Sequence, residues 1–434
     1  MEEKKYTARQ LAVLSLCRLE REGKYGNLEA DAAIKKFKLQ GAEKALYTRL
    51  FYGVLERKIT LDYIISQCTD KPLDDMTYEM KNILRISAYQ LFYLDRIPEY
   101  SIVNESVELA KKYERKSAGG FVNAVLRRMI RQGKPEIKRG DNDVKYLSLK
   151  YSVSEQICGL LCSALGFEEA EKMLKADLTR RGVTLRVNTL KTTVDGLQKL
   201  LNDNGIKAEK ITQSDFGLKI DENTDTETLF SLINDLAYIE DGASQAAVTL
   251  LDVMPGMILA DVCAAPGGKT VSAAMQMENK GEIFAFDIHK NKLRLIEKTA
   301  EKAGVTIIKT AEHDGRQPVP ELIGKCDRVI CDVPCSGLGV IGQKPDMRYK
   351  DPGDTERLIN TQRAILSSAS RYLKPGGVMV YSTCTVLPSE NMENVTDFLS
   401  KNTDFILLYE KTYYPHIDGC DGFYTAKIVR KEND

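Results

Sequence analysis

Residues 258–270 read ILADVCAAPGGKT and pass from an apolar run, through small residues, to a polar stretch. The pattern predicts a buried strand at 258–262, a loop at 263–269 and a helix that begins at Thr270. Small residues in such a loop let the backbone approach a ligand closely, and the helix start offers N–H groups that have no partner within the helix. The segment therefore predicts a ligand site at a strand-to-helix corner.

After Asp241 short apolar strands alternate with helical patterns. The predicted strands span residues 258–262, 282–286, 306–309, 328–333 and 378–381. Strands that alternate with helices indicate a mostly parallel sheet with helices on both faces, and ligands bind such sheets beyond the carboxyl ends of the strands. We expect residues 241–434 to form a Rossmann-like α/β domain.

The N-terminal third is predicted to be helical. Between residues 6 and 131 apolar residues recur at spacings of three and four, and the dipeptides at 71–72, 97–98 and 119–120 indicate helix breaks because they contain proline or two glycines. We expect an all-α domain over residues 1–140.

A polar stretch at 132–143, which contains glycine and proline, predicts a linker. The segment that follows, 144–240, combines helices at 154–165 and 194–202 with a strand at 183–187. This mixture indicates a small α+β module, so the chain is predicted to hold three domains.

The composition is that of an ordinary soluble protein: of 434 residues, 43% are hydrophobic and 29% are charged. A chain of this length is expected to form two or three domains. It contains no run of about 18 apolar residues, and its start, MEEKKYTARQ, lacks the layout of a signal peptide. We expect a cytoplasmic protein without a membrane partner.

The ten cysteines include no C-x-x-C pair, and the chain has only three histidines. The cysteines at 158 and 162, and those at 331 and 335, are four residues apart, yet no histidine adjoins them in the sequence. These patterns argue against a disulfide framework and against a metal site, and they predict mostly reduced thiols.

Charge is distributed unevenly, although the formal net charge is zero. Residues 1–140 hold 27 Lys/Arg and 19 Asp/Glu, a balance of +8; subtraction from the totals of 62 and 62 leaves 35 and 43, a balance of −8. The densest basic stretch runs from Arg127 to Arg139. The asymmetry predicts that the N-terminal part faces a polyanion, and a solvated basic face is the alternative.

The glycine loop does not fit two common nucleotide sites. A P-loop requires glycine at position 263, which is cysteine, and a nicotinamide site prefers G-x-G-x-x-G. Acids follow successive strands at Asp287, Asp314 and Asp332. One such acid is more often a helix cap, but three are harder to dismiss, and an acid at the place of Asp287 can accept hydrogen bonds from ribose hydroxyls. The pattern favours S-adenosylmethionine as the cofactor.

Two cysteines are predicted to follow strands of the same sheet. Cys335 lies in DVPCSG, residues 332–337, and Cys384 lies in YSTCT, residues 381–385. A pyrimidine ring carbon is too weakly nucleophilic to take a methyl group directly, so an enzyme must first add a thiolate beside it and eliminate that thiolate later. Two thiols beside one cofactor loop indicate ring-carbon methylation, although the residues alone do not rank them.

These motifs resemble those of the RNA cytosine-5 methyltransferases of the NOL1/NOP2/Sun family. The likeness rests on blocks at 186–189, 261–270, 332–337, 381–385 and 421–424. Blocks at 52–55, 84–86, 103–110 and 121–127 resemble the RNA-binding NusB fold. The fusion is similar to the members of the family that methylate bacterial 16S ribosomal RNA.

The resemblance implies a fold and a reaction. The fold would be an all-α NusB-like N-terminal domain, a small RRM-like α+β module and a C-terminal Rossmann-like S-adenosylmethionine-dependent methyltransferase domain. The reaction would methylate carbon 5 of a specific cytosine in 16S ribosomal RNA through a covalent cysteine–RNA intermediate. Cys384 would add to carbon 6, Asp332 would hydrogen-bond the ring near nitrogen 3, and Cys335 would assist removal of the carbon 5 proton.

The resemblance also implies the residues that hold the cofactor: Cys263, Ala264, Ala265, Pro266, Gly267, Gly268, Lys269, Asp287, Asp314 and Asp332. A thiolate at neutral pH needs a positive neighbour or a helix N-terminus, and Lys269 is one candidate. The partner would be small-subunit ribosomal RNA, and we expect a monomer without a metal. Residues 341–346, IGQKPD, depart from relatives that carry basic residues before His-Pro-Asp, which puts RNA affinity or site choice in question.

Three other functions remain open. The same chemistry on transfer RNA would use the same motifs, and only the NusB-like domain favours ribosomal RNA. A non-catalytic RNA-binding factor would keep the fold and lose cofactor binding. An amino-group methyltransferase usually carries Asn or Asp followed by Pro-Pro and an aromatic residue, where this chain has DVPC at 332–335.

Overall fold

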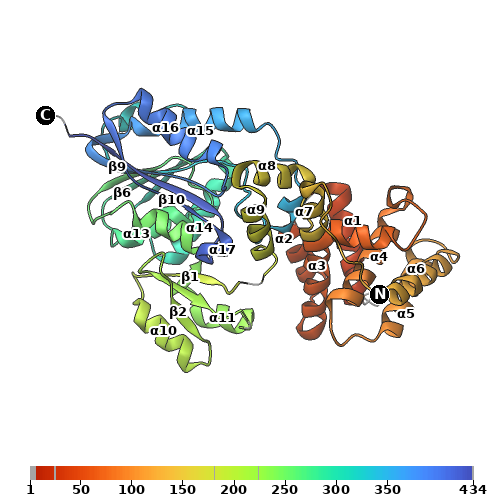
Figure 1. Ribbon diagram of the computed structural model, residues 1–434. Helices are drawn as coiled ribbons and strands as arrows, with labels where there is room; N and C mark the ends of the chain where they lie inside the picture. The colour runs from red at the N-terminus through yellow and green to blue at the C-terminus, as the bar shows by residue number, and fades with distance from the viewer. Residues whose placement is uncertain (1–5, 24–25, 180, 223, 433–434) are drawn as a thin grey trace. The chain divides into compact units, whose positions relative to one another are not determined.

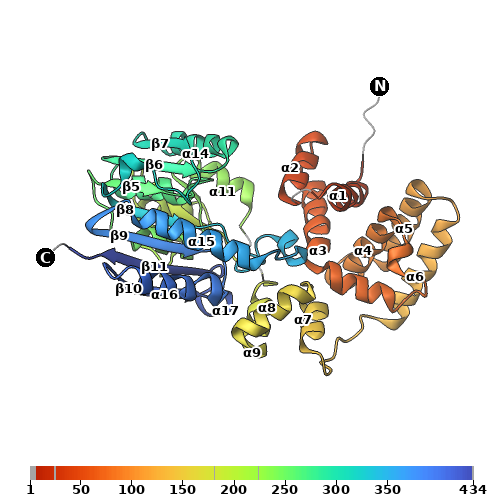
Figure 2. The same ribbon diagram turned by 90° about the horizontal axis from the view of Figure 1, so that it is seen from above.

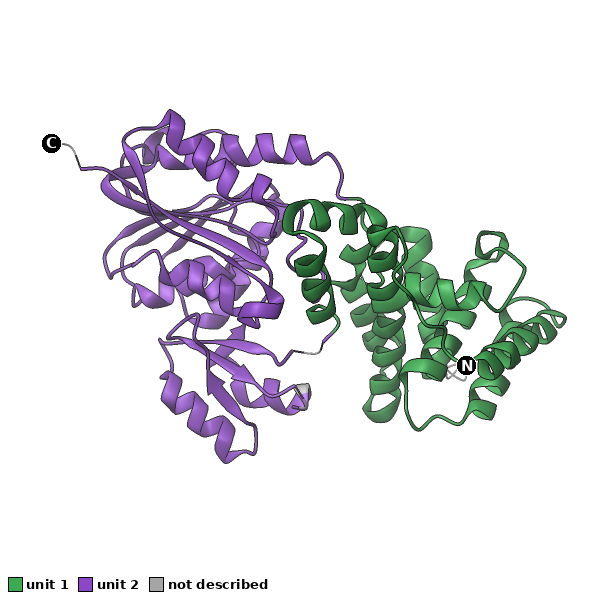
Figure 3. Cartoon of the chain, in the orientation of Figure 1, with its two compact units in different colours: residues 1–178, 344–351 green, residues 179–343, 352–434 purple. Residues whose placement is uncertain are grey.

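The computed structural model describes residues 6–432, apart from residues 24–25, 180 and 223. Contacts divide the chain into two compact units: unit 1 holds residues 1–178 and 344–351, and unit 2 holds residues 179–343 and 352–434 (Figure 3). The first five residues of the predicted domain 1–140 and the last two of 241–434 lie outside the described residues. The bounds 1–140, 144–240 and 241–434 stay predictions.

Unit 1 begins with helices only, as the spacing of its apolar residues predicts (Figure 1). The first helix starts at a capping box, in which the Thr7 hydroxyl accepts the Gln10 N–H at 3.3 Å and the Gln10 side chain accepts the Thr7 N–H. Buried residues of the helices, such as Leu50 and Phe51, form one core. The helices are α1 (Ala8–Glu22), α2 (Gly26–Lys36), α3 (Gly41–Ser66), α4 (Tyr78–Tyr93), α5 (Glu99–Tyr113) and α6 (Ala118–Gln132).

The expected helix break at residues 119–120 is wrong. Both glycines lie in the first turn of α6, where N–H groups have no partner within the helix and glycine is tolerated. A Cβ on Gly119 would lie 3.1 Å from Lys111 and 3.2 Å from Val107 of α5, so the close approach of the two helices explains that glycine. The expected linker is present, because residues 133–142 form neither helix nor strand.

Three further helices belong to unit 1: α7 (Asp143–Tyr151), α8 (Glu155–Leu165) and α9 (Phe167–Ala176). A one-turn helix from a distant part of the sequence, η3 (Pro345–Tyr349), joins them. Its Arg348 is fully buried and donates to the carbonyls of Tyr151 at 3.1 Å and Asp177 at 2.8 Å. The contacts of unit 1 therefore continue past the linker, to residue 178.

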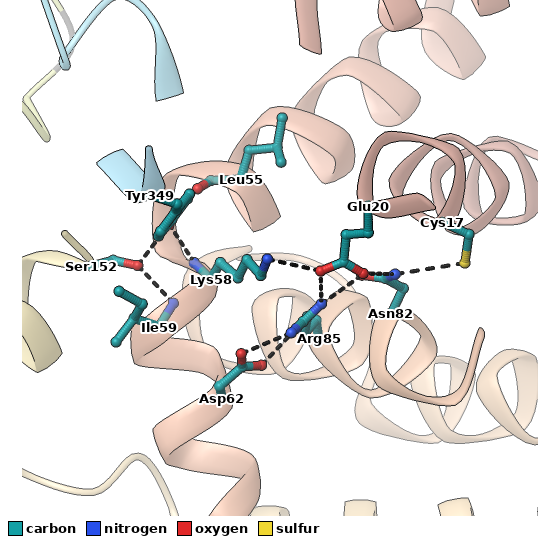
Figure 4. A network of polar contacts seen from close by, with 10 residues as sticks. All are labelled: Cys17, Glu20, Leu55, Lys58, Ile59, Asp62, Asn82, Arg85, Ser152 and Tyr349. Carbon is teal, nitrogen blue, oxygen red and sulfur yellow. Dashed lines mark hydrogen bonds and ion pairs between the residues drawn. The ribbon is translucent and has the colours of Figure 1, made fainter. Parts of the chain in front are cut away.

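Helix α3 is kinked at Arg57, whose φ of −130° and ψ of 19° are not helical. A kink interrupts the helical hydrogen bonds, so the backbone groups that it frees need other partners. The Tyr349 hydroxyl accepts the Lys58 N–H at 2.9 Å and donates to the Leu55 carbonyl at 2.5 Å, and Ser152 accepts the Ile59 N–H at 2.9 Å (Figure 4). Ser152, at the end of α7, and Tyr349 of η3 thus supply the hydrogen-bond partners that the kinked turn of α3 lacks.

A buried ion network joins α1, α3 and α4 (Figure 4). Arg85, whose side chain is 4% exposed, binds both carboxylate oxygens of Asp62, at 2.6 and 2.8 Å, and one oxygen of Glu20 at 2.8 Å. Lys58 binds the same Glu20 oxygen at 2.8 Å. Burial raises the pKa of Glu20, but Arg85 and Lys58 outweigh it and lower that pKa to about 2.

Unit 2 contains a small antiparallel sheet with the strand order β2-β3-β1-β4. The predicted strand at 183–187 and helix at 194–202 are both present. After the first strand, the Asn188 side chain donates to the carbonyls of Asp235 and Ala303, both at 3.0 Å. The elements are β1 (Thr184–Val187), α10 (Val194–Asp203), β2 (Ala208–Lys210), β3 (Gly217–Ile220), α11 (Thr226–Ile233) and β4 (Ala237–Ile239).

The second sheet of unit 2 has the order β10-β11-β9-β8-β5-β6-β7 (Figure 2). From β9 to β7 neighbouring strands are parallel, as predicted, whereas β10 and β11 add an antiparallel edge that the sequence analysis did not predict. The strands are β5 (Ile258–Asp261), β6 (Glu282–Asp287), β7 (Ile308–Glu312), β8 (Cys326–Asp332), β9 (Leu373–Thr383), β10 (Phe405–Tyr413) and β11 (Phe423–Arg430).

Helices cover both faces of this sheet, and alternate residues of its strands point to opposite faces. Val329 and Cys331 of β8 lie in the core beneath the helices α15 (Thr355–Ser370) and α16 (Met392–Lys401). Ile330 lies in the other core, against α12 (Gly242–Thr249), α13 (Gly268–Gln276) and α14 (Lys290–Ala303). Three short elements of the described chain complete this part of unit 2: η2 (Pro320–Leu322), η4 (Pro388–Glu390) and α17 (Pro415–Asp418).

Within the described residues, every helix is too short or too polar to span a membrane. The same residues contain no group of three or more His, Cys, Asp or Glu side chains placed to hold a metal ion. The expected absence of a metal stays a prediction.

The Glu20 carboxylate predicts how stability depends on pH. Its pKa is lowered in the folded state, so its contribution is complete above the ordinary value near 4.5 and is lost as the pH falls toward 2. We expect Glu20→Gln to destabilise the protein by roughly 2–3 kcal/mol at pH 7, and the gap to close between pH 4.5 and pH 2. Urea unfolding followed by circular dichroism at a series of pH values measures it.

Glu108→Gln is the matched control, because Glu108 is 71% exposed and pairs across one helical turn with Lys111. It should change the urea midpoint little at any pH. A gap between Glu20→Gln and the wild type that stays constant from pH 7 to pH 2 would contradict the assignment.

Candidate active site

The glycine loop follows β5 and is fixed against the neighbouring strand. The Ala264 N–H donates to the Phe286 carbonyl of β6 at 2.7 Å. Gly267 has a φ of +104°, and a Cβ there would lie 3.0 Å from the Ile296 Cα of α14. Both the backbone conformation and the close approach to α14 require glycine. The peptide between Ala265 and Pro266 is cis.

Asp261, the last residue of β5, lies beneath the loop and is fully buried. Its carboxylate accepts the Thr270 hydroxyl at 2.6 Å and the Cys263 N–H at 3.4 Å. Burial raises its pKa to about 7, although the Thr270 hydrogen bond opposes the shift. Asp261 therefore joins the base of the loop to the first turn of α13.

The predicted cofactor acids gather around Cys263. Burial is the largest cause that raises the pKa of the Cys263 thiol, and the charges of Asp261, Asp332, Asp287 and Asp314 follow in that order. In the described part of the chain no hydrogen bond joins Asp287 or Asp314 to the loop 263–269. Asp287 instead accepts the His289 N–H at 2.9 Å.

Asp314 is held by a neighbouring arginine. Arg316 Nε lies 3.0 Å from each carboxylate oxygen, and Arg316 Nη2 lies 2.6 Å from Oδ2. This hydrogen bonding is the main cause that lowers the pKa of Asp314. Asp314 is therefore a carboxylate whose two oxygens are already hydrogen-bonded to Arg316.

Asp332 is bound by a cation and by a hydroxyl. Lys269 Nζ donates to Asp332 Oδ2 at 2.8 Å, and the Ser382 hydroxyl donates to Oδ1 at 2.7 Å. Burial lowers the pKa of Lys269, but Asp332 raises it above the ordinary value overall, with smaller contributions from Glu240 and Cys384. Lys269 is thus a partly buried ammonium whose charge interacts with Asp332 and Glu240.

The two predicted cysteines come together at the carboxyl ends of β8 and β9. Their sulfur atoms are 3.0 Å apart, and the Cys384 N–H points to the Cys335 sulfur at 3.1 Å. Neither cysteine forms a disulfide, and both are partly exposed. The Ser336 hydroxyl donates to the Thr385 hydroxyl at 2.8 Å, so the residues that follow the two cysteines also join their loops.

A third loop contacts the Cys335 loop at two glycines. The Gly339 N–H donates to the Cys384 carbonyl at 3.0 Å, and the Gly422 N–H donates to the Gly339 carbonyl at 2.8 Å. A Cβ on Gly339 would overlap the Gly422 carbonyl, and a Cβ on Gly422 would lie 2.7 Å from the Gly339 Cα. The block at 421–424 is therefore next to the cysteines in space.

Several polar residues at this site were missed by the sequence analysis. They are Asp261, Ser382, Glu390 and Asn391, all buried. Asp261 had a usable signal, because it ends the strand before the glycine loop. Glu390 had none, since nothing in its own segment indicates that it contacts the loop of Cys335, 55 positions earlier.

The parallel sheet, its glycine loop and the strand-end acids define the class: a Rossmann-like methyltransferase domain joined to a helical domain. The family model described as 16S rRNA methyltransferase RsmB/F matches residues 248–429. The NusB family model matches residues 6–131, and the ferredoxin-like domain of RsmF/B-like methyltransferases matches residues 159–227.

Similarity to curated proteins extends over the whole chain. A Bacillus subtilis (strain 168) protein named probable ribosomal RNA small subunit methyltransferase B is 35% identical, and the match covers 99% of this chain and 100% of the relative. A Synechocystis protein of the same name is 32% identical, over 98% and 99% of the two chains. The chain belongs to the RsmB/F family of 16S rRNA methyltransferases.

Two solved structures support the fold. A methyltransferase homologue from Pyrococcus horikoshii is 28% identical with a TM-score of 0.59, and the match covers 67% of this chain and all of that one. The crystal structure of PH0851 matches the full length of both chains with a TM-score of 0.80. At 24% identity the latter likeness concerns the fold alone.

The contact between the two glycines predicts the effect of adding a methyl group. We expect Gly339→Ala to destabilise the protein by roughly 1–3 kcal/mol, because the backbone of Gly422 must move. Hydrogen–deuterium exchange should become faster at Gly339 and Gly422, and thermal unfolding should begin at lower temperature.

Gly159→Ala serves as the control, since it lies within α8 and a Cβ there would meet no atom within 4 Å. Alanine is favoured over glycine in a helix, so this variant should be as stable as the wild type or slightly more stable. Equal behaviour of the two variants would show that the two loops are not in close contact.

Proposed function

We propose that this protein methylates carbon 5 of a cytosine in 16S ribosomal RNA, with S-adenosylmethionine as the methyl donor and a covalent cysteine–RNA intermediate. The observation that carries the proposal is the pair of thiols, 3.0 Å apart, beside the Lys269–Asp332 ion pair. A nitrogen nucleophile would need no thiol, because its lone pair attacks the methyl donor directly.

The residues of the glycine loop fit the proposed cofactor. Gly267 lets the backbone come close to a ligand, and the N-terminus of α13 directs free N–H groups toward the same edge. Asp287, at the end of β6, is placed where an acid accepts hydrogen bonds from ribose hydroxyls. When bound there, S-adenosylmethionine supplies an electrophilic methyl group. Residues 263–269, with Asp287, Asp314 and Asp332, would hold it.

Cys384 would act as the nucleophile. Its thiolate adds to carbon 6 of cytosine and forms a carbon–sulfur bond, while the ring electrons move toward carbon 5. The ammonium of Lys269 is close enough for its charge to interact with Cys384, and a positive neighbour favours a thiolate. The choice of Cys384 over Cys335 follows the family resemblance.

Asp332 would hydrogen-bond the ring near nitrogen 3 and assist the electron flow to carbon 5. It is 28% exposed, and Lys269 and Ser382 fix its carboxylate. After methyl transfer Cys335 would assist removal of the proton from carbon 5. The electrons of that carbon–hydrogen bond then expel Cys384 as a thiolate and restore the aromatic ring.

The target cytosine must leave any stack to reach the thiols, so the proposed substrate is single-stranded or flipped RNA. The basic N-terminal part would contribute contacts to the phosphate backbone. Ribosomal RNA as substrate would place the reaction in the cytoplasm. A monomer is expected.

A denaturing gel tests the covalent step. The variants Cys384→Ala and Cys335→Ala are incubated with 16S ribosomal RNA and S-adenosylmethionine. Because Cys335 is needed only for release, we expect Cys335→Ala to accumulate a protein–RNA adduct. We expect Cys384→Ala to form none and to lose methyl transfer by at least about 10³-fold.

Cys420→Ala is the matched control, because Cys420 is a buried cysteine of the same unit and lies outside the proposed chemistry. It should transfer methyl groups and leave no adduct. Methyl transfer that persists in both active-site variants, without an adduct, would overturn the ring-carbon mechanism in favour of nitrogen methylation.

A second assay identifies the RNA. We expect 5-methylcytosine, measured by mass spectrometry of digested RNA, to appear in 16S ribosomal RNA and not in transfer RNA at equal concentration. The reverse result would move the same chemistry to transfer RNA. Failure to bind S-adenosylmethionine in calorimetry would instead support a non-catalytic RNA-binding factor.

A further inference from the structure

Two adjacent residues, Glu390 at the end of η4 and Asn391, hold the two cysteine loops. Glu390 Oε2 accepts the Ser336 N–H at 2.9 Å, immediately after Cys335. Asn391 accepts the Thr383 hydroxyl at 2.5 Å and donates to the Thr385 carbonyl at 3.0 Å, on either side of Cys384. A single turn of chain therefore sets the distance between the loops.

The Glu390 carboxylate lies within the protein without a cation. The residue is 1% exposed, and Oε2 accepts a second hydrogen bond from the neutral Gln362 at 2.7 Å. Oε1 is buried and has no hydrogen-bond partner, and among the described residues no Lys, Arg or His forms an ion pair with Glu390. An uncompensated buried carboxylate is costly, and a neutral acceptor would hold Ser336 at less cost.

The charged and titratable groups around the thiols come from several elements. Tyr381 belongs to β9, and Cys384 follows the end of that strand. The Tyr381 hydroxyl donates to the Glu390 carbonyl at 2.6 Å. Arg363 of α15 donates to Asn394 at 2.8 Å, and its Nε lies 3.8 Å from the Asp397 carboxylate.

Lys269 of α13 pairs with Asp332 of β8. Glu390 is thus the acid beside Cys335, whereas Lys269 is the cation whose charge acts on Cys384.

We propose that Glu390 is a positioning residue that fixes the loop of Cys335 and, through its charge, keeps the proton of this thiol pair on Cys335 in the free enzyme, so that Cys335 must lose this proton before it can take up the one from carbon 5. Cys384 is then the thiol that ionises. The inference rests on the roles of the two cysteines in the proposed function and explains how two neighbouring thiols become unequal. The hydrogen bond with Cys384, followed by burial and by the charges of Cys384 and Glu390, raises the pKa of Cys335 well above its ordinary value.

The test follows the alkylation of Cys335 by iodoacetamide between pH 6 and pH 11, with peptide mass spectrometry as the readout. Cys384→Ser is the parent, so that one thiol of the pair titrates. We expect its midpoint above the ordinary thiol value of about 8.5. Adding Glu390→Gln should lower the midpoint by about one pH unit, which is about a tenfold faster alkylation on the low-pH limb, with an unchanged plateau at high pH.

Two further variants separate charge from loop geometry. Glu390→Asp keeps the charge and should keep the midpoint of the parent. Glu393→Gln removes an exposed acid from the same segment and should change nothing. A rate that rises equally at every pH in Glu390→Gln would mean only a looser loop and would overturn the role of the charge, as would an unchanged midpoint.

The inference can be tested even if Glu390→Gln does not fold, because the Cys384→Ser protein gives a result by itself. A Cys335 alkylation midpoint at or below the ordinary thiol value in that protein would overturn the inference. Alkylation needs neither RNA nor S-adenosylmethionine. If the midpoint shifts as expected and no RNA forms an adduct, the proposed function fails while the effect of Glu390 on the thiol stands. If adducts form and the midpoint does not shift, only the role of Glu390 fails.

Discussion

The parallel pairing of β8 with β9 is the constraint on which the candidate active site depends. In this pairing Asp332 lies opposite Ser382, so the two strands end together at one edge of the sheet. Each strand then needs only two or three more residues to reach its cysteine. A slip of one residue would separate the carboxylate from its serine and turn every side chain of the strand to the other face. The strand pairing therefore brings the two cysteine loops to the same edge of the sheet, and Glu390 and Asn391 hold them there.

Acidic and basic side chains are unevenly distributed at this edge of the sheet, and their charges act differently on the proposed cofactor and on the two thiols. Asp261, Asp287 and Asp332 surround the glycine loop, and Lys269 balances part of their charge. A sulfonium compound such as the proposed cofactor is a cation at its reacting end, so carboxylates there suit it. Glu390 holds the loop of Cys335 and forms no ion pair with any of the residues that the structure describes. The charge of Lys269 thus acts on Cys384, and that of Glu390 acts on Cys335.

Much of the catalytic half could be predicted from the sequence, because its signals are local. The five predicted strands and the glycine loop reflect apolar runs and small residues, and the cysteines follow their strands directly. Two contacts could not be predicted from the sequence: the pairing of Lys269 with Asp332 and the hydrogen bond between Glu390 and Ser336. Each joins segments that are distant in the sequence, and neither segment has a pattern that indicates its partner. The prediction of a helix break at Gly119 was wrong, because the sequence does not show which helix packs against this glycine.

Residues 344–351 are part of unit 1, although the chain before and after them belongs to unit 2. Their Arg348 is buried against carbonyls of Tyr151 and Asp177, and their Tyr349 completes the kink of α3. A protein without the helices of unit 1 would leave this guanidinium without its carbonyl acceptors. The helical unit is therefore completed by a segment of chain that is inserted into the sequence of unit 2, and a cut at residue 178 would not separate the two units cleanly.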